Sequence, residues 1–298
     1  MFRKLMTTLL ALVLVLAATL TCAQAEGYTI GFAVSTLENP FFVTMKDAAV
    51  AKAAELGVEL VVLDAQDSAE TQASQVEDFI TRGVNLLIIN PVDSDAIGTS
   101  VVACNEADIP VITVTRASNA GNVIQHLDID NKEAGRLDAE QLLKDLDGKG
   151  KVAILEGIAG SSSAIEREEG FVAALEGSEV EVVTSLTANY SREEGATVTE
   201  DILQSNPELD AIYAHNDEMA LGAVRAVAAA GRSAEIKIYG IDATDDALTA
   251  VENGEMAATV QQQPDVQIET ALENAVKYLN GETLEPLVNI PLKLIVKE

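Results

Sequence analysis

Short apolar runs rich in β-branched residues alternate with longer segments of helical spacing along almost the whole chain. The runs are Tyr28–Val34, Val58–Asp64, Asn85–Asn90, Ile109–Thr113, Lys151–Glu156, Val180–Leu186, Leu209–His215, Ile236–Asp242 and Ala257–Gln261. This alternation predicts βαβ units and a parallel sheet. Because the runs are apolar throughout, we expect strands that helices cover on both faces.

The segment that follows the first strand run has the signals of a helix with defined ends. Asn39 can cap its N-terminus, Pro40 suits the first helical position, and apolar residues recur at helical spacing from Phe42 to Leu56. Gly57 is typical of the position just after a helix. The pattern predicts a helix that begins at Pro40 and ends before Gly57.

The strand and helix pattern restarts after Lys149-Gly150, which indicates two similar halves. A chain of 298 residues with 48% hydrophobic residues can form two cores. No segment rich in Pro, Ser or Gly separates the halves, so we expect a compact hinge rather than a flexible tether. The predicted fold is α/β, with two similar doubly wound parallel-sheet lobes.

The first 25 residues have the three parts of a secretory signal, which predicts export to the periplasm and a mature chain beginning at Glu26. These parts are the basic Arg3 and Lys4, the apolar run Leu9–Leu20, and the cleavage pattern Ala23-Gln24-Ala25. The run is shorter than the roughly 20 residues that a membrane-spanning helix needs, and no later segment could span a membrane. Lipid anchoring outside the cytoplasmic membrane through Cys22 is the alternative.

The chain is strongly acidic, with 19 basic and 48 acidic residues. Removing the signal takes two basic residues and no acidic one, so the formal charge changes from −29 to −31. This charge argues against nucleic acid as a partner. Cys104 is the only cysteine of the predicted mature chain, which excludes an internal disulfide, and we expect it to fill space in the core.

Planar amides, guanidinium groups, carboxylates and aromatic rings follow the predicted strands. They are Asn39, Phe41, Phe42, Thr115, Arg116, Arg167, Asn189, Tyr190, Asn216, Asp217, Asp242 and Gln261–Gln263. In open α/β sheets, ligands bind outside the carboxyl ends of the strands. Amides, carboxylates and guanidinium groups can bridge neighbouring hydroxyls, and aromatic rings can lie against the C–H faces of a sugar. The set therefore predicts a sugar site.

The sequence lacks the patterns of common catalytic and metal sites. Neither His126 nor His215 is near a nucleophile motif, and no Gly-x-Ser-x-Gly elbow or His/Cys spacing for a metal is present. The segment Gly157–Ser163 resembles a phosphate loop but lacks the Lys-Ser/Thr that must follow. We interpret it as a tight turn from strand to helix, and expect no enzyme activity, cofactor or metal.

Four longer stretches resemble the periplasmic ribose-binding proteins and related sugar receptors of ABC importers. They are Ser35–Phe42, Ile89–Ala96, Gly157–Gly160 and Asn216–Ala223, and the resemblance covers nearly the whole predicted mature chain. It implies two lobes, joined by three crossing strands, that close over a sugar and deliver it to a membrane permease. The implied first lobe comprises residues 26–129 and 263–291, and the second comprises 130–262 and 292–298.

The resemblance also implies which residues contact the sugar. They are Asn39, Phe41, Phe42, Arg116, Arg167, Asn216, Asp242 and Gln262, with Tyr190 where ribose receptors have Phe. Thr115 stands where those receptors have Asp, and Ile241 replaces an aromatic ring beside Asp242. Losing a carboxylate and a ring predicts that ribose is not the preferred ligand. Another pentose, a hexose, a polyol or an anionic sugar derivative remain alternatives.

Proteins of a related fold that have other functions require different sequence features. We expect a monomeric import receptor. A sensor coupled to a chemoreceptor, or a quorum-signal receptor, that serves signalling more than import is the closest alternative. A sugar-responsive repressor needs an N-terminal helix-turn-helix where the secretory signal stands. A hydrolase or isomerase needs an acid/base pair, and the sequence indicates no partner carboxylate for Asp242.

Overall fold

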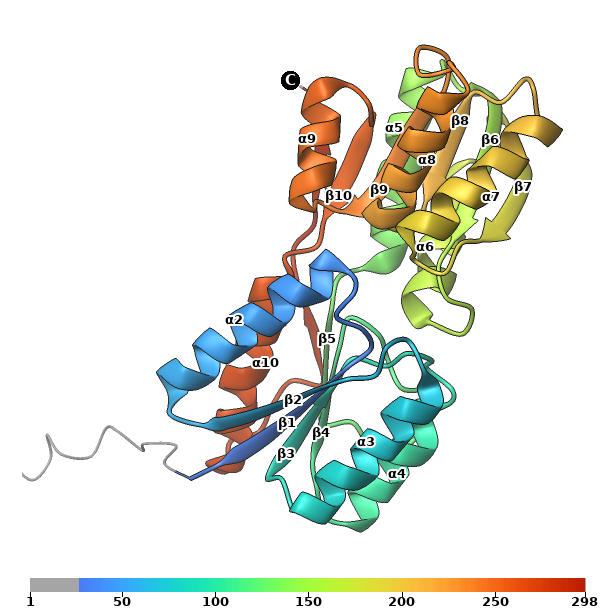
Figure 1. The fold of residues 1–298 in the computed structure, drawn as a ribbon. Helices are drawn as coiled ribbons and strands as arrows, with labels where there is room; N and C mark the ends of the chain where they lie inside the picture. Colours follow the sequence, from blue (N-terminus) through green and yellow to red (C-terminus); the bar gives the residue numbers. More distant parts are fainter. Residues whose placement is uncertain (1–26, 298) are drawn as a thin grey trace, which may run out of the picture.

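The computed structural model describes residues 27–297, which form two α/β lobes stacked along the long axis of the molecule (Figure 1). The predicted secretory signal, its cleavage site and Cys22 lie outside the described residues. Within residues 27–297, no helix is both long and apolar enough to cross a membrane.

The first lobe is built on a parallel sheet with the strand order β11-β5-β4-β3-β1-β2. Its strands are β1 (Thr29–Val34), β2 (Glu59–Asp64), β3 (Leu86–Ile89), β4 (Val111–Val114), β5 (Gln125–Asp128) and β11 (Leu287–Asn289). Its helices are α2 (Pro40–Leu56), α3 (Ala69–Arg82), α4 (Ile97–Glu106) and α10 (Pro264–Leu279). Figure 1 shows α2 and α10 on one face of the sheet and α3 and α4 on the other, so both faces are buried.

The second lobe has the strand order β12-β10-β9-β8-β6-β7. Its strands are β6 (Lys149–Glu156), β7 (Glu179–Thr187), β8 (Ala211–Ala214), β9 (Lys237–Asp242), β10 (Ala258–Gln261) and β12 (Lys293–Val296). Its helices are α5 (Asn131–Asp145), α6 (Ser162–Ala174), α7 (Arg192–Ser205), α8 (Asp217–Ala229) and α9 (Asp245–Asn253). Helices α5 and α6 pack on one face of this sheet, and α7, α8 and α9 pack on the other.

Three chain segments pass between the lobes, after β5, after β10 and after β11 (Figure 1). They are tied together where they cross, because the Ile290 amide donates to the Asp128 carbonyl at 2.8 Å. The Gln263 side-chain amide also donates to the Pro291 carbonyl at 2.7 Å. A hinge of three bonded segments restricts the lobes to a few modes of relative movement.

The structure confirms the predicted fold class and the predicted strands, whose ends shift by one or two residues. The first helix also ends as expected, because the Asn39 side chain accepts a bond from the Phe41 amide at 2.9 Å and Gly57 has a φ of 70°. Cys104 is fully buried in the core, as predicted, and burial raises its pKa to about 11.

Three strands were not predicted. The first, β5, is polar in sequence, and its Gln125 is buried because the side-chain amide donates to the Glu285 carbonyl at 2.8 Å. The other two, β11 and β12, are short strands that follow the last crossings. The expectation of wholly parallel sheets was wrong at one edge, because β12 pairs with β10 in the antiparallel direction.

Candidate functional site

A small cavity of about 250 Å³ lies between the two lobes. Eleven residues line it: Asn39, Phe41, Phe42, Thr115, Arg116, Ser163, Arg167, Tyr190, Asn216, Asp242 and Gln262. The structure therefore brings together the ten residues that we expected to contact the ligand, whereas Asn189, Asp217, Gln261 and Gln263, which also follow predicted strands, lie outside this cavity. Ser163, at the start of α6, is the one lining residue that was not predicted, because the segment Gly157–Ser163 was interpreted as a structural turn.

Several lining residues have backbone conformations that are rare outside glycine. Thr115 has a φ of 66°, Tyr190 a φ of 59° and Asp242 a φ of 142°. A β-branched residue such as Thr115 is particularly strained with a positive φ. Strained residues of this kind cluster at binding and active sites, where the surrounding structure holds them in place.

Arg116 follows β4 and is 3% exposed. Its guanidinium carbon lies 5.5 Å from the ring centroid of Phe42 and 5.1 Å from that of Tyr190, so two rings hold the cation between them. One nitrogen, Nη1, donates to the Pro91 carbonyl at 3.0 Å, whereas Nε has no hydrogen-bond partner. Burial lowers the pKa of Arg116, although an arginine remains charged in proteins.

Arg167 enters the cavity from α6 and is 2% exposed. Its Nε donates to Asn131 Oδ1 at 2.9 Å, and its Nη1 donates to the His215 carbonyl at 2.6 Å. These bonds fix the guanidinium against the second lobe. The ion pairs of arginines in residues 27–297 involve Arg82, Arg136, Arg192 and Arg232. Both cavity arginines are therefore buried cations without an ion pair.

Asp242 is the single carboxylate that lines the cavity, and it is 5% exposed. Its Oδ1 accepts a short bond from Gln262 Nε2, whereas Asp242 Oδ2 and Gln262 Oε1 have no partner. Burial, followed by the negative charge of Asp217, raises the pKa of Asp242 well above its usual value, and Arg167 opposes this rise. Two buried acceptors therefore remain free for a ligand.

Thr115 belongs to a chain of polar contacts across the hinge. Its hydroxyl donates to Gln267 Oε1 at 3.1 Å, and Gln267 Nε2 donates to the Gln262 carbonyl at 3.1 Å. Gln267 is fully buried at the start of α10. These two hydrogen bonds link the residue after β4 to the residue after β10. They hold the backbone of Gln262, whose side chain lines the cavity.

Tyr190 presents its ring to Arg116 and points its hydroxyl toward two serines. The Tyr190 hydroxyl lies 3.2 Å from Ser161 Oγ and 3.0 Å from Ser163 Oγ, and the two serine hydroxyls are 3.3 Å apart. Ser161 also caps α6 by accepting a bond from the Ala164 amide at 3.2 Å. This cluster holds the Tyr190 ring in place and accounts for the role of the hydroxyl that a Phe would lack.

Two asparagines that line the cavity also cap helices. Asn39 Oδ1 accepts from the Phe41 amide, and Asn216 Oδ1 accepts from the Met219 amide at 3.0 Å. Capping occupies the oxygen of each side chain and leaves the nitrogen as a donor, and Asn216 Nδ2 donates one of its hydrogens to the Tyr190 carbonyl at 3.4 Å. Beside them, Phe41 and Phe42 pack edge to face, with ring centroids 5.1 Å apart.

Backbone and serine groups join the lobes at one side of the cavity. The Ser94 amide donates to the Gly160 carbonyl at 3.1 Å, and the Ser162 amide donates to Ser94 Oγ at 3.1 Å. The Ala117 amide donates to Ser162 Oγ at 3.0 Å. These bonds between lobes show that the structure is in a closed arrangement at this edge.

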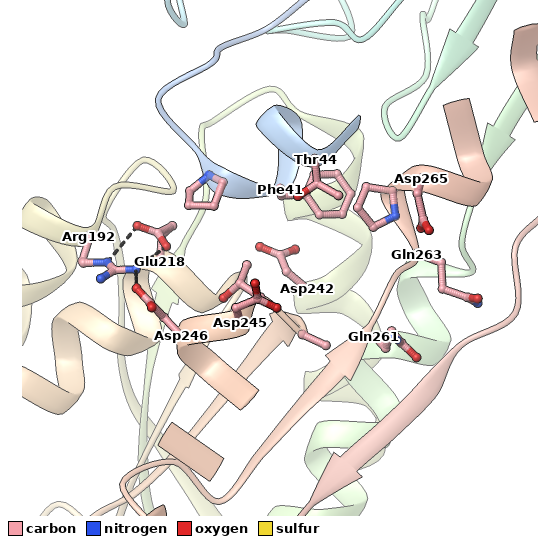
Figure 2. Close-up of a pocket in the computed structure, with 14 residues that line it drawn as sticks. Phe41, Thr44, Arg192, Glu218, Asp242, Asp245, Asp246, Gln261, Gln263 and Asp265 are labelled. Carbon is pink, nitrogen blue, oxygen red and sulfur yellow. Dashed lines mark hydrogen bonds and ion pairs between the residues drawn. The ribbon is translucent and has the colours of Figure 1, made fainter. Parts of the chain in front are cut away.

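A larger hollow, which we call the vestibule, adjoins the cavity and shares Phe41 and Asp242 with it (Figure 2). Its empty volume is about 880 Å³, including space open to solvent. Figure 2 shows Arg192 bonded to Glu218 and Asp246 at its edge. The lining also includes the exposed Asp245 and Asp265 together with Gln261 and Gln263. The vestibule therefore forms an acidic rim beside the cavity.

Other residues singled out from the sequence lie outside the cavity. Ile241 is fully buried in a core cluster of the second lobe, so the expected loss of a ring from the cavity wall was wrong. Asp217 accepts bonds from Thr259 Oγ1 and the Thr244 amide, and burial raises its pKa to about 6. His215 is fully buried, and burial lowers its pKa to about 3, which agrees with a structural role.

The sequence is similar to that of known binding proteins. Residues 30–283 match the family model of the periplasmic binding protein domain. The ribose import binding protein RbsB of Haemophilus influenzae is 44% identical over 98% of this chain and 99% of its own length. RbsB of Escherichia coli is 41% identical over 95% of each chain.

Solved structures give the same result for the fold. An ABC transporter solute binding protein from Bacillus halodurans C-125, solved with bound myo-inositol, superposes with a TM-score of 0.87. The two sequences are 35% identical, and the match covers 92% of this chain and 96% of the other. The chain therefore belongs to the periplasmic binding protein domain family.

Proposed function

We propose that this protein captures a monosaccharide, or a closely related polyol or sugar derivative, between its two lobes and delivers it to an ABC transporter. The observation that carries the proposal is the set of unpartnered polar atoms in the closed cavity. Arg116 Nε, Asp242 Oδ2 and Gln262 Oε1 are all buried without a hydrogen bond. Leaving such groups unpaired costs about 1–3 kcal/mol each, which a polyhydroxy ligand would offset.

The lining of the cavity supports a small polyhydroxy ligand of this kind. Phe41 and Phe42 offer apolar faces for C–H groups, while the amides and guanidinium groups offer donors for oxygens. The relatives named above are ribose import binding proteins and a solute binding protein solved with bound myo-inositol, which agrees with this chemistry.

We also propose that the cavity binds without catalysing a reaction. Glycoside hydrolysis typically uses two carboxyl groups placed on either side of the bond that breaks. Among the cavity residues, Asp242 is the one carboxylate, and no histidine lines the wall. Within residues 27–297, no cluster of His, Cys, Asp or Glu could hold a metal ion.

The predicted secretory signal supports a periplasmic location for the mature chain, with an anchor at Cys22 as the alternative. We propose the lobe boundaries implied by the resemblance, residues 26–129 with 263–291 and residues 130–262 with 292–298, and a monomeric receptor. The crossings after β5, β10 and β11 support these boundaries. Delivery requires contact with a membrane permease. A receptor of the same ligand that serves a chemoreceptor is the second candidate.

A thermal-shift panel tests the binding function. The mature protein is heated with pentoses, hexoses, polyols and sugar acids, because a ligand that binds only the folded state stabilises it. At a concentration of 100 times Kd the expected gain is about 2.7 kcal/mol. An amino-acid panel is the control. A set of sugars and derivatives that leaves the melting temperature unchanged, while another class of solute raises it, contradicts the proposal.

A further inference from the structure

The two arginines give the cavity more hydrogen-bond donors than its unpartnered oxygens give it acceptor sites. A guanidinium group carries five N–H groups, of which Arg116 uses one within the described structure and Arg167 uses two. Four N–H groups of Arg116 and three of Arg167 therefore have no partner among the described residues. Against these stand Asp242 Oδ2 and Gln262 Oε1, two unpartnered oxygens with two lone pairs each.

The charge of the cavity has the same bias. Arg116 and Arg167 are at least nine-tenths buried, and neither forms an ion pair. Asp67 faces Arg116 from an exposed position in a neighbouring hollow but forms no ion pair with it. Asp242 is the one carboxylate of the cavity and stands against two arginines, so a ligand that supplies a negative charge balances the second cation and gains more than a neutral one.

From this cavity, and resting on the proposed function, we infer that the preferred ligand is a sugar acid, a monosaccharide-sized polyhydroxy compound that carries a carboxylate. A carboxylate has only acceptor sites and forms paired, charge-assisted bonds with a guanidinium group. The remaining hydroxyls donate to Asp242 Oδ2 and Gln262 Oε1. This arrangement satisfies both sets of unpartnered atoms.

The acidic vestibule does not cancel this preference. Asp245, Asp246 and Asp265 are exposed to solvent, so counter-ions screen them over about 8 Å at physiological ionic strength. The two cavity arginines are buried and act on the ligand without comparable screening. The rim therefore slows the entry of an anion, while the cavity determines how tightly it binds.

Titration calorimetry on the mature protein with matched pairs tests the inference. The pairs are D-ribose with D-ribonate, D-glucose with D-gluconate, and D-galactose with D-galacturonate. We expect the tightest ligand to be an acid that binds at least ten-fold more tightly than its neutral partner. A neutral sugar as the tightest ligand overturns the inference and leaves the sugar receptor intact. Absence of binding by every member of every pair rejects both.

A substitution at Thr115 tests the cause of the preference. Thr115→Asp places a carboxylate beside Arg116 and removes the hydroxyl that donates to Gln267, so we expect acid binding to weaken at least ten-fold more than binding of the neutral partner. Asp tolerates a positive φ better than Thr, so the variant should fold, which its melting temperature verifies. Thr197→Asp, the same change at an exposed site on α7, should leave both affinities unchanged. An unchanged acid preference in Thr115→Asp contradicts the assignment.

Discussion

Replacing Asp242 by alanine is expected to weaken binding of the tightest ligand by about one to two decades while leaving the melting temperature of the ligand-free protein nearly unchanged. The carboxylate offers a free Oδ2 to ligand hydroxyls, and a bond to a charged group contributes about 1.5–3 kcal/mol. Without ligand we expect the lobes to be open, so water solvates this carboxylate. Its removal therefore affects the complex much more than the free protein.

Calorimetry and thermal denaturation of Asp242→Ala measure the two effects separately. Asp201→Ala, which removes an exposed carboxylate on α7, is the control for net charge and should change neither quantity appreciably. If Asp242→Ala instead retained full affinity and lowered the melting temperature, Asp242 would be a structural residue and the site assignment would be wrong.

Replacing a second buried carboxylate, Asp138 on α5, is expected to have a large effect on stability. Asp138 is fully buried, and neither of its oxygens has a hydrogen-bond partner. Burial, followed by the charge of Asp217, raises its pKa well above the usual value of 3.8. We expect Asp138→Ala to raise the free energy of unfolding at pH 7 by about 1–3 kcal/mol, because an unpaired polar group leaves the core.

Denaturant unfolding at several pH values tests this expectation. A carboxyl group with a higher pKa in the folded than in the unfolded state binds more protons when folded, so stability falls as pH rises above 3.8. Asp217, with a pKa of about 6, contributes in the same direction between 3.8 and about 6. The wild type should therefore lose stability as pH rises from 4 to 7, and Asp138→Ala should lose less.

Glu140→Ala, an exposed change on the same helix, is the control and should alter stability by no more than about 0.5 kcal/mol. A decrease in stability for Asp138→Ala at pH 7 would mean that Asp138 is paired in solution. In that case the Asp138 carboxylate would stabilise the packing of α5 instead of destabilising it.

The sequence allowed most of the cavity to be predicted because parallel strands place their carboxyl ends at one edge. Once the strand runs were recognised, Arg116, Tyr190 and Asp242 had to lie at the edges of their sheets, and the resemblance placed both edges in one cleft. Arg167 is further along, on α6; it was among the polar residues that follow the predicted strands, and the resemblance implied that it contacts the sugar.

The contacts that tune the cavity could not be predicted in this way. The bond from Thr115 to Gln267 joins residues 152 positions apart, and no local pattern marks it. Ser163 was missed because it belongs to a run of serines at the start of α6, where a serine is usually a cap, the role that Ser161 has here. The position of Ile241 was misjudged because adjacent residues of a strand point to opposite faces, so the neighbour of a site residue faces the core.

Small-angle X-ray scattering of the mature protein, with and without the tightest ligand, tests most directly the claim that the lobes enclose a sugar. The cavity residues come from both lobes, so the ligand gains its full set of contacts only in the closed form. We expect a larger radius of gyration without ligand and a scattering curve that matches the described closed structure at saturation. A ligand-free protein that is open and keeps the same radius of gyration at saturating ligand would contradict closure around the sugar.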